Sequence, residues 1–316
     1  MKIFRALLKL CLITSILTFS KPVLADEVLM ITWRGKTSAD IGFETRLKQL
    51  NPKIKFSYID ANKDKTKLAN AIRSTDFSKF KLVYSFGTTG SKITKSALNG
   101  GVPHVFNIVS TPLLSRIIES FDKPGNNVTG VHHTLDVETQ FNALVRLKSV
   151  KNIGVWIDPR ERTTLVQAKR LEELAKRNGI TLKKFRVIVN VDSFDEMLKE
   201  ASNAAKDLDA IFIPSGSSYI DKPEKLFAHL DDSVFIFGAV NQYVGKGATV
   251  ALAASYTERG EAAAELAHKI LKGANAGDIP VNRLTAQKAR LYVDKKRAKA
   301  VGIKDPKLLG FEVVER

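Results

Sequence analysis

The strongest constraint on the fold is a repeated alternation of short apolar runs with longer amphipathic ones. In the first half of the chain "EVLMITW" is followed by "SADIGFETRLKQL", "IKFSYID" by "DKTKLANAIRS", "KLVYSFG" by "TTGSKITKSAL", and "VPHVFNIV" by "PLLSRIIESF". Apolar strands that alternate with amphipathic helices indicate βαβ units and a parallel sheet with helices on both faces.

The same alternation restarts after "DVETQFNALVRLK". There, "NIGVWID" leads to "RTTLVQAKRLEELAKRNG", which ends at Gly179, a residue type expected just past a helix C-terminus. "TLKKFRVIV", "AIFIPSGS" and "VFIFGAV" add strands, and the long helix "TERGEAAAELAHKILKG" precedes a last strand and short helix in "ARLYVDKKRAKAVGI". The sequence therefore predicts an α/β fold with two successive open sheets. Ligands of such sheets bind outside the carboxyl ends of the strands, so residues just after strands are the site candidates.

The first 25 residues have the features of a secretory signal. Lys2, Arg5 and Lys9 give a basic start, "LCLITSILTF" follows, and Val23 and Ala25 occupy the positions that a signal peptidase reads. The apolar run is shorter than the ~20 residues that span a bilayer, which disfavours an uncleaved anchor. We therefore expect cleavage after Ala25 and a soluble, periplasmic protein.

Composition narrows the function classes. The single cysteine, Cys11, lies in the predicted signal, so the mature chain has no thiol for a disulfide or a metal site. Loss of the four basic residues of the signal lowers the formal net charge from +17 to +13 (17 − 4). The lysines are scattered, which favours a solvated surface, with an anionic ligand as the alternative. Nucleic acid is not an expected partner of an exported protein.

The stretch "YSFGTTGSK" looks like a phosphate loop but fits neither nucleotide-binding motif. A Walker A loop needs four residues between its glycines, whereas only two separate Gly87 from Gly90, and no G-x-G-x-x-G follows the first strand. What remains is a glycine turn with Thr88 and Thr89 at a helix start, where free N–H groups and the helix dipole favour an anion. The alternative is that a threonine only caps its own helix.

Two tryptophans occupy matching places near the end of the first strand of each predicted lobe, Trp33 and Trp156. Because Trp prefers sites with one apolar and one wet side, we expect both to flank the apolar part of a ligand, with core or rim as the alternative. Asp158 could accept a hydrogen bond from a ligand amine or cap the turn "DPRERT". Arg34 could pair a ligand carboxylate or be solvated.

Catalysis and metal binding have no motif in the chain. "IPSGSS" lacks the G-x-S-x-G nucleophile elbow, and the five histidines show no metal-ligand spacing. No catalytic residue, metal ligand or cofactor is expected.

The segment "GTTGSKITKSALNGGVPHVFNIVSTPLLSRIIESFDKPGNNVTGV" resembles the ABC-transporter substrate-binding family that includes tryptophan- and tyrosine-binding members. "IGVWIDPRERTTLVQAKRLEELAKRNGI" is similar to the family's second-lobe opening, and "AAELAHKILKGANAGDIPV" to its late helix. The similarity covers almost all of the mature chain. It implies a type I periplasmic-binding fold, in which two lobes joined by three crossovers close on a ligand by hinge motion.

The resemblance also implies domain bounds and site residues. The first 25 residues would be the signal peptide, 26–134 plus 257–282 the first lobe, and 135–256 plus 283–316 the second. The crossovers would lie near His133, Thr257 and Arg283. Carried over by position, the ligand contacts would be Trp33, Gly87, Thr88, Thr89, Ser110, Trp156, Asp158, Ser215, Ser217 and Asn241.

Two short segments depart from the family pattern. "PSGSS" stands where members often have "PTDN", and "GAVNQ" where they often have "ASD", so two acids that would hold an amino group are missing. The expected function is a non-catalytic, monomeric solute receptor that binds a small aromatic or carboxylate-bearing ligand between its lobes and delivers it to an ABC permease. The alternative is a periplasmic sensory module that presents ligand to a signalling partner.

Overall fold

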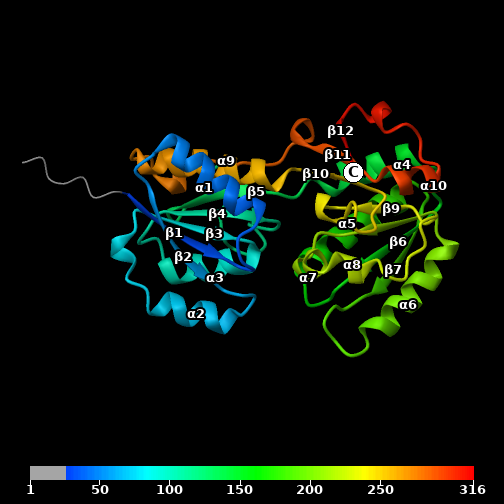
Figure 1. The fold of residues 1–316 in the computed structure, drawn as a ribbon, viewed down its shortest axis with the longest axis horizontal. Coiled ribbons are helices and arrows are strands. Elements are labelled where there is room, and N and C mark those ends of the chain that lie inside the picture. The colour runs from blue at the N-terminus through cyan, green and yellow to red at the C-terminus, as the bar shows by residue number, and fades with distance from the viewer. Residues whose placement is uncertain (1–25) are drawn as a thin grey trace, which may run out of the picture.

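Two α/β lobes lie side by side, each built on its own sheet (Figure 1). The computed structural model describes residues 26–316. The predicted signal peptide and its cleavage site lie outside the described residues.

The first lobe contains a five-stranded sheet in the order β2-β1-β3-β4-β5, in which all neighbours pair in parallel. Its strands are β1 (Glu27–Thr32), β2 (Lys55–Asp60), β3 (Leu82–Phe86), β4 (His104–Val109) and β5 (Val128–His132). Its helices are α1 (Ser38–Leu50), α2 (Lys65–Arg73), α3 (Thr88–Leu98) and the late helix α9 (Tyr256–Leu271). Figure 1 shows α1 and α9 on one face of this sheet and α2 and α3 on the other.

The second lobe contains a seven-stranded sheet in the order β12-β11-β10-β9-β8-β6-β7. Its strands are β6 (Asn152–Ile157), β7 (Thr181–Arg186), β8 (Ala210–Ile213), β9 (Ile236–Gly238), β10 (Val250–Ala253), β11 (Arg290–Val293) and β12 (Glu312–Glu315). Its helices are α4 (Val137–Leu147), α5 (Arg162–Arg177), α6 (Phe194–Ala204), α7 (Ser217–Asp221), α8 (Pro223–Leu226) and α10 (Lys295–Val301). Strands β10 and β11 pair antiparallel, and the other neighbours pair in parallel. Across both lobes, short 3-10 turns lie at Phe77–Lys79, Ala205–Asp207, Asn241–Tyr243, Ala276–Asp278, Ala286–Lys288 and Pro306–Leu309.

The chain passes between the two sheets three times: after β5, after β10 and after α9. The first and third passages lie together, because the N–H of His132 donates to the Asn282 carbonyl and the N–H of Asn282 donates to the Gly130 carbonyl. The two-lobed α/β fold predicted from the alternation is therefore confirmed.

Helix ends follow local sequence signals. In α1, the Thr37 hydroxyl accepts from the Ala39 N–H, and the Asp40 carboxylate accepts from the Thr37 N–H at 2.7 Å, so both start the helix. Helix α5 ends at Arg177, and Gly179, two residues beyond, has φ +66°. The N–H of Ile180 then donates to the Ala175 carbonyl, which is the bond of a Schellman turn.

Two glycines let α1 and α9 approach closely. A Cβ placed on Gly260 would lie 2.0 Å from the Ala39 carbonyl oxygen, and one placed on Gly42 would lie 2.5 Å from the Thr257 carbonyl oxygen. The contact joins an early helix to one that returns from the second lobe. Only glycine allows this backbone separation.

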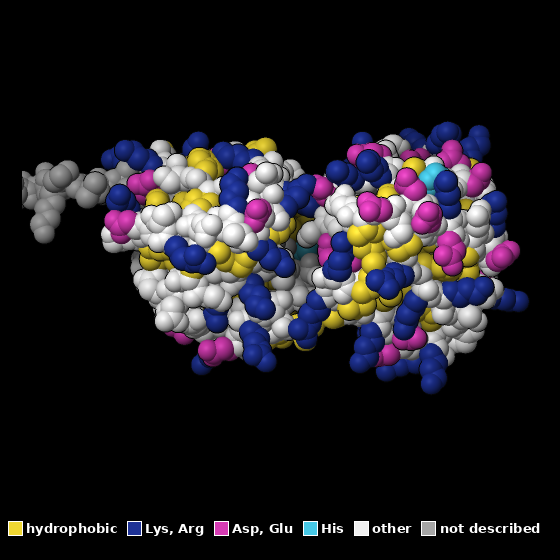
Figure 2. Space-filling view, turned by 90° about the horizontal axis from the view of Figure 1, so that it is seen from below, with side chains coloured by type: hydrophobic (Ala, Val, Ile, Leu, Met, Phe, Trp, Pro, Cys, Tyr) yellow, Lys and Arg dark blue, Asp and Glu magenta, His cyan; other side chains and the backbone are white. Residues whose placement is uncertain are grey.

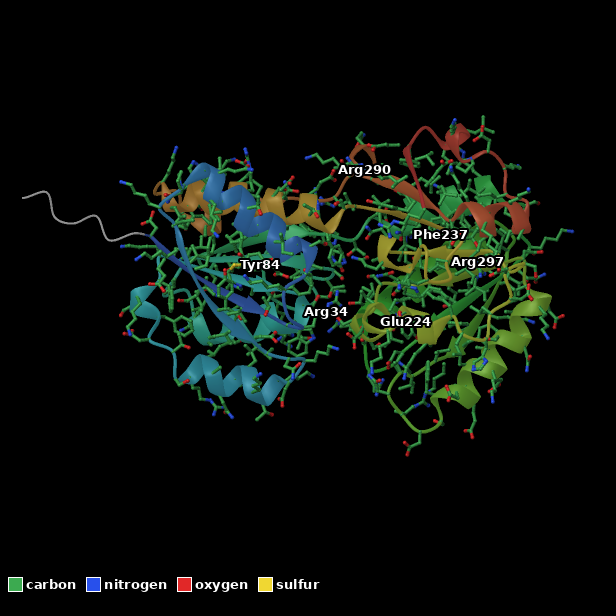
Figure 3. All side chains as sticks on the ribbon, viewed as in Figure 1. Arg34, Tyr84, Glu224, Phe237, Arg290 and Arg297 are labelled. Atoms are coloured by element: carbon green, nitrogen blue, oxygen red, sulfur yellow. The ribbon has the colours of Figure 1, made fainter. Side chains whose placement is uncertain are left out.

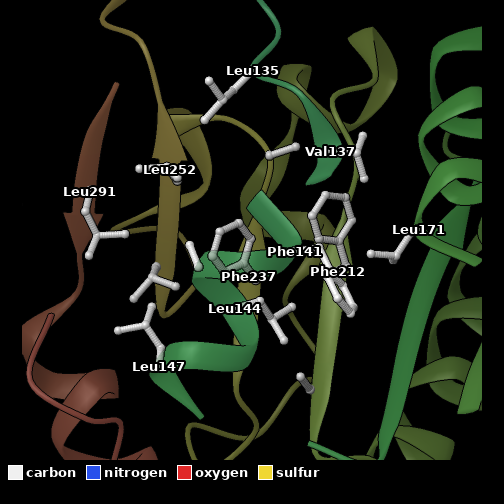
Figure 4. Packing of buried hydrophobic residues seen from close by; sticks show 14 of the residues in the cluster. Leu135, Val137, Phe141, Leu144, Leu147, Leu171, Phe212, Phe237, Leu252 and Leu291 are labelled. Atoms are coloured by element: carbon white, nitrogen blue, oxygen red, sulfur yellow. The ribbon is translucent and has the colours of Figure 1, made fainter. Parts of the chain in front are cut away.

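The core of the second lobe is aromatic and aliphatic (Figure 4). Phe212 and Phe237, on neighbouring strands, stack with ring centroids 5.8 Å apart and planes 9° apart. Leu144 from α4 belongs to the same cluster, so α4 packs on the second sheet, although it directly follows the first lobe in the sequence.

No helix within residues 26–316 has both the length and the apolar character that a membrane crossing requires.

Candidate ligand-binding site

A cavity of about 1060 Å³, here called the cleft, lies between the lobes and takes walls from both. Figure 2 shows Lys and Arg side chains on both sides of the narrowing between them. The predicted site residues that line it are Trp33, Gly87, Thr88, Thr89, Ser110, Ser215 and Ser217. Trp156, Asp158 and Asn241 do not belong to its lining.

The loop after β1 places Trp33 and Arg34 on the cleft wall. The Asp60 carboxylate holds this loop, because it accepts from the Gly35 N–H at 2.8 Å and from the Thr32 hydroxyl at 2.9 Å. Burial acts to raise the pKa of Asp60, but these hydrogen bonds outweigh it and lower the pKa below its usual value. Arg34 lies with its guanidinium carbon 5.4 Å from the centre of the Phe86 ring.

The start of α3 faces the cleft without a side-chain cap. Gly87, at φ +76°, precedes the helix, and a Cβ added there would meet nothing within 4 Å. Within residues 26–316 no group accepts from the N–H of Thr88, Thr89 or Gly90. The Thr88 hydroxyl accepts from the Ser110 N–H at 3.3 Å, so it joins two loops of the site rather than capping its own helix.

The end of β4 is distorted where it reaches the cleft. The pairing of β4 with β5 shifts register between Phe106 and Val109, and Ile108 has φ +53°. A β-branched residue in this region is strained, and such strain gathers at functional sites. The Asn107 carboxamide oxygen stabilises the turn by accepting from the Ile108 N–H at 2.8 Å. The distortion places Ile108 in the cleft wall.

His133 and Tyr256 close the inner wall. The two rings meet edge to face with centroids 5.9 Å apart. Both residues are buried and line the cleft. Burial lowers the pKa of His133 to about 3, so the ring is neutral at physiological pH.

In the second lobe the carboxylate of Asp158 is already engaged. Asp158 is fully buried, and its two oxygens accept from the Arg160 side chain at 2.7 and 3.0 Å. Arg160 also donates to the Val189 carbonyl at 2.6 Å. The Arg160 guanidinium therefore occupies the Asp158 carboxylate that was expected to accept a hydrogen bond from a ligand amine.

Two side chains hold the loop before α7: Gln167 from α5, and Glu161 from the turn before α5. The Glu161 carboxylate accepts from the N–H groups of Ser217 and Ser218, each at 2.6 Å. The Gln167 carboxamide accepts from the Ser215 N–H at 3.1 Å and donates to its hydroxyl at 2.8 Å. The start of α7 thus carries an internal anion, whereas the start of α3 does not.

Two further predicted site residues lie outside the cleft lining, one buried in the core and one in a half-buried turn. Trp156 was expected to face the ligand, but it lies within β6, is 0% exposed and packs in the second lobe's core with Tyr219 and Val187. Asn241 lies in a 3-10 turn outside the cleft lining, where its carbonyl accepts from the Arg316 side chain at 3.2 Å.

Other cleft residues were not predicted as site residues. They include His133, Arg160, Glu161, Lys63 and Tyr256. The charged segment "DPRERT" directly after a strand was a usable signal for Arg160 and Glu161. His133 had none, since adjacent histidines have no distinctive spacing.

A second cavity, of about 860 Å³, lies beside α9 and β11. Its lining has four basic and four acidic side chains, and two ion pairs lie among them: Arg46 with Glu265 at 2.6 Å and Arg290 with Glu258 at 2.6 Å. Because its charges are internally matched, the cleft is the better candidate for a ligand site. Among the described residues, no cluster of His, Asp and Glu could hold a metal ion.

Comparisons with known proteins place the fold in a family. The chain is 24% identical over 233 residues to a tyrosine-binding protein from Clostridioides difficile, a match that covers 73% of this chain and 66% of that relative, slightly under two thirds of its length. A conserved domain protein from Vibrio cholerae superposes with a TM-score of 0.80, at 22% identity and with 92% and 99% of the two chains covered.

An ABC domain from Streptococcus pneumoniae in complex with L-Trp superposes with a TM-score of 0.76, at 20% identity and with 91% and 99% of the two chains covered. The type I periplasmic-binding fold is shared with these structures. Residues 30–311 match the family described as "ABC transporter substrate binding protein". The chain belongs to the ABC transporter substrate-binding protein family.

Proposed function

We propose that the protein is the extracytoplasmic solute receptor of an ABC importer, which binds a small ligand between its lobes and presents it to a membrane permease. The observation that carries this proposal is the cleft of about 1060 Å³, with walls from both lobes and an uncapped helix start. A concave site with apolar walls and a few convergent polar groups suits a small molecule. Membership of the family supports the importer role, and the ligands named for its relatives support a compact organic solute.

The proposed binding mode places the most polar end of the ligand at the start of α3. The N–H groups of Thr88, Thr89 and Gly90 are open donors, and the glycine before them allows close approach. Trp33, which is half-buried on the same wall, would contact the apolar part of the ligand. Ser217 would supply polar contact from the second lobe.

The proposed mature protein is a periplasmic monomer without catalytic activity that starts after Ala25. Residues 26–134 plus 257–282 would move as one lobe and 135–256 plus 283–316 as the other. The three passages of the chain between the sheets support these bounds.

The test is a thermal-shift screen of residues 26–316 against amino acids, organic acids, sugars and nucleosides. A ligand at 100 times its Kd should stabilise the protein by ~2.7 kcal/mol. Calorimetry then compares the parent with Thr89→Ala, which should lose about 0.5–1.5 kcal/mol of binding free energy, or up to ~3 kcal/mol if its partner is charged. Thr181→Ala is the matched control, because Thr181 is exposed at the start of β7 and does not line the cleft. Unchanged binding by Thr89→Ala, or no hit in any class, would count against the proposed site.

A further inference from the structure

We propose that the ligand is an organic anion without an ammonium group, that is, a carboxylic acid rather than a zwitterionic amino acid. This ligand class deepens the proposed function and rests on it. Three observations carry it: the excess of cations around the cleft, the partners that its acids already have, and the hydrogen-bond donors left open.

Cations outnumber acids on the cleft wall. The lining has seven Lys and Arg residues, which are Arg34, Lys63, Lys65, Arg73, Lys92, Arg160 and Arg162. Lys63 pairs with Asp221 and Arg160 with Asp158. The other five form no ion pair with any carboxylate in the part of the chain that the structure describes. A cleft lined by one sign of charge concentrates ligands of the opposite sign.

The acids near the cleft already have ion-pair or hydrogen-bond partners. The lining contains two, Glu161 and Asp221. Both oxygens of Glu161 accept backbone N–H groups at 2.6 Å, and Asp221 contacts the Lys63 ammonium at 2.5 Å. Behind them, Asp158 is fully buried against Arg160. An ammonium group would therefore enter a site in which cations outnumber acids and both acids already hold partners, and a buried charge without a partner is strongly disfavoured.

The open groups on the wall are donors. The start of α3 offers N–H groups that no described residue accepts from. Arg34, which Figure 3 shows at the edge of the first lobe beside the second, has five N–H donors and no carboxylate partner. A carboxylate is the group that suits both.

His133 adds an independent buried donor. The residue is 7% exposed and lines the cleft, and neither ring nitrogen has a hydrogen-bond partner among the described residues. The backbone of Val109 lies near the ring and acts to raise its pKa, but its geometry is not that of a hydrogen bond to either ring nitrogen. A neutral imidazole has one N–H donor and one acceptor nitrogen, so the ring can donate to an oxygen of the ligand without adding positive charge to the cleft.

The rest of the wall defines the body of the acid. Trp33, Phe86, Ile108 and Tyr256 supply apolar and aromatic surface on the same side of the cleft. The Trp33 ring lies against the first turn of α3, since a Cβ on Gly90 would be 3.9 Å from it. The acid should therefore carry an aromatic or branched body next to its carboxylate.

The experiment compares matched compounds that differ in one charged group. Calorimetry on residues 26–316 would use L-tryptophan, indole-3-propionate and tryptamine, then L-tyrosine, 3-(4-hydroxyphenyl)propionate and tyramine, and finally L-leucine and 4-methylpentanoate. At least one acid should bind about tenfold or more tightly than its amino acid, and the amines should not bind. An amino acid that binds as tightly as its matched acid overturns the inference and leaves the receptor proposal standing. So does a panel in which no acid binds while the wider screen yields a sugar or nucleoside.

A charge variant tests the same point on the protein side. Arg34→Gln should weaken binding of the best acid by about 10-fold or more, the range for a lost hydrogen bond to a charged group, and reduce its salt dependence. Lys183→Gln, exposed on the edge strand β7, is the control and should bind like the parent. Equal affinity of Arg34→Gln and the parent would overturn the assignment of Arg34 to the carboxylate.

Discussion

At the residue scale, position relative to a strand end decides whether a large ring reaches the ligand or the core. Trp33 is the first residue after β1 and sits half-buried on the cleft wall. Trp156 is the second-last residue of β6 and is fully buried. In a parallel sheet covered on both faces, a side chain still inside a strand packs under a helix whichever way it points. The two rings therefore stabilise different things.

The two tryptophans should separate stability from binding. Trp156→Ala should lower the free energy of unfolding by about 3–5 kcal/mol, because it leaves a large cavity in the second lobe. Trp33→Ala should cost much less stability and instead weaken ligand binding, through lost contact area. Denaturant unfolding and calorimetry on both variants check this, and a Trp156→Ala protein as stable as the parent would contradict the burial argument.

Residue positions along the chain predicted the first-lobe site better than the second. The glycine turn and the threonines of "GTTGSK" define a helix start by themselves, and all three residues, Gly87, Thr88 and Thr89, line the cleft. The fate of Asp158 depended on Arg160 folding back over it, and that of Trp156 on one or two residues of strand length. A fully apolar strand lacks the alternation that would fix where it ends, so the burial of Trp156 could not be predicted from the pattern. The contact of Arg160 with Asp158 depends on side-chain geometry, which the pattern does not contain.

At the element scale, two helix starts that face the cleft differ in what they hold. The start of α7 is matched by the Glu161 carboxylate, whereas that of α3 is open to a ligand. The periodicity predicted most strands and all the long helices in their order, but "PLLSRIIESF", expected to form a helix after β4, forms only turns. The strands β10 and β12 and the short helices α7 and α8 were not predicted. It did not predict the kink at Ile108, because positive φ at a β-branched residue is set by the surrounding structure rather than by local preference.

The close contact of α1 with α9 gives a prediction for the first lobe. Gly260→Ala should destabilise the protein by about 1–3 kcal/mol, because the added methyl group would lie 2.0 Å from a backbone oxygen and push the helices apart. Glu261→Ala, exposed on the same helix, is the control and should change stability by less than about 0.5 kcal/mol. A Gly260→Ala variant that melts at the parent's temperature would show that the helices separate freely.

At the scale of the whole molecule, buried neutral histidines link stability to pH. Burial lowers the pKa of His104 and His133 to about 3 and that of His132 to about 4, whereas an unfolded histidine titrates near ~6.5. Below that value the unfolded chain binds protons that the folded chain refuses, so stability is complete above about pH 6.5 and falls as the pH drops toward 4. Each histidine contributes at most about 1.4 kcal/mol per pH unit.

Urea unfolding at pH 7.5 and pH 5 should therefore give a lower midpoint at pH 5. His133→Asn should reduce that difference, since it removes one of the three groups while keeping a polar side chain at the cleft. His229→Asn, in the loop after α8 and exposed, is the control. Identical midpoints at both pH values would mean that the folded protein binds protons at these histidines at pH 5 as readily as the unfolded chain does.

The lobes already touch across the cleft, and this contact gives the last prediction. Lys63, in the loop after β2, pairs with Asp221 at the end of α7, and both side chains are part-exposed. A pair of this kind stabilises the contact by about 0–1 kcal/mol, so the lobes should separate readily when no ligand bridges them. A ligand that contacts both walls favours the closed arrangement by its differential affinity. Small-angle scattering should therefore show a smaller radius of gyration at saturating ligand, and Asp221→Asn should widen the ligand-free protein while leaving the liganded radius unchanged. Lys295→Gln, which breaks an ion pair with Glu315 away from the cleft, should leave both radii at the parent's values. If the parent's scattering is the same with and without ligand, closure is not part of binding.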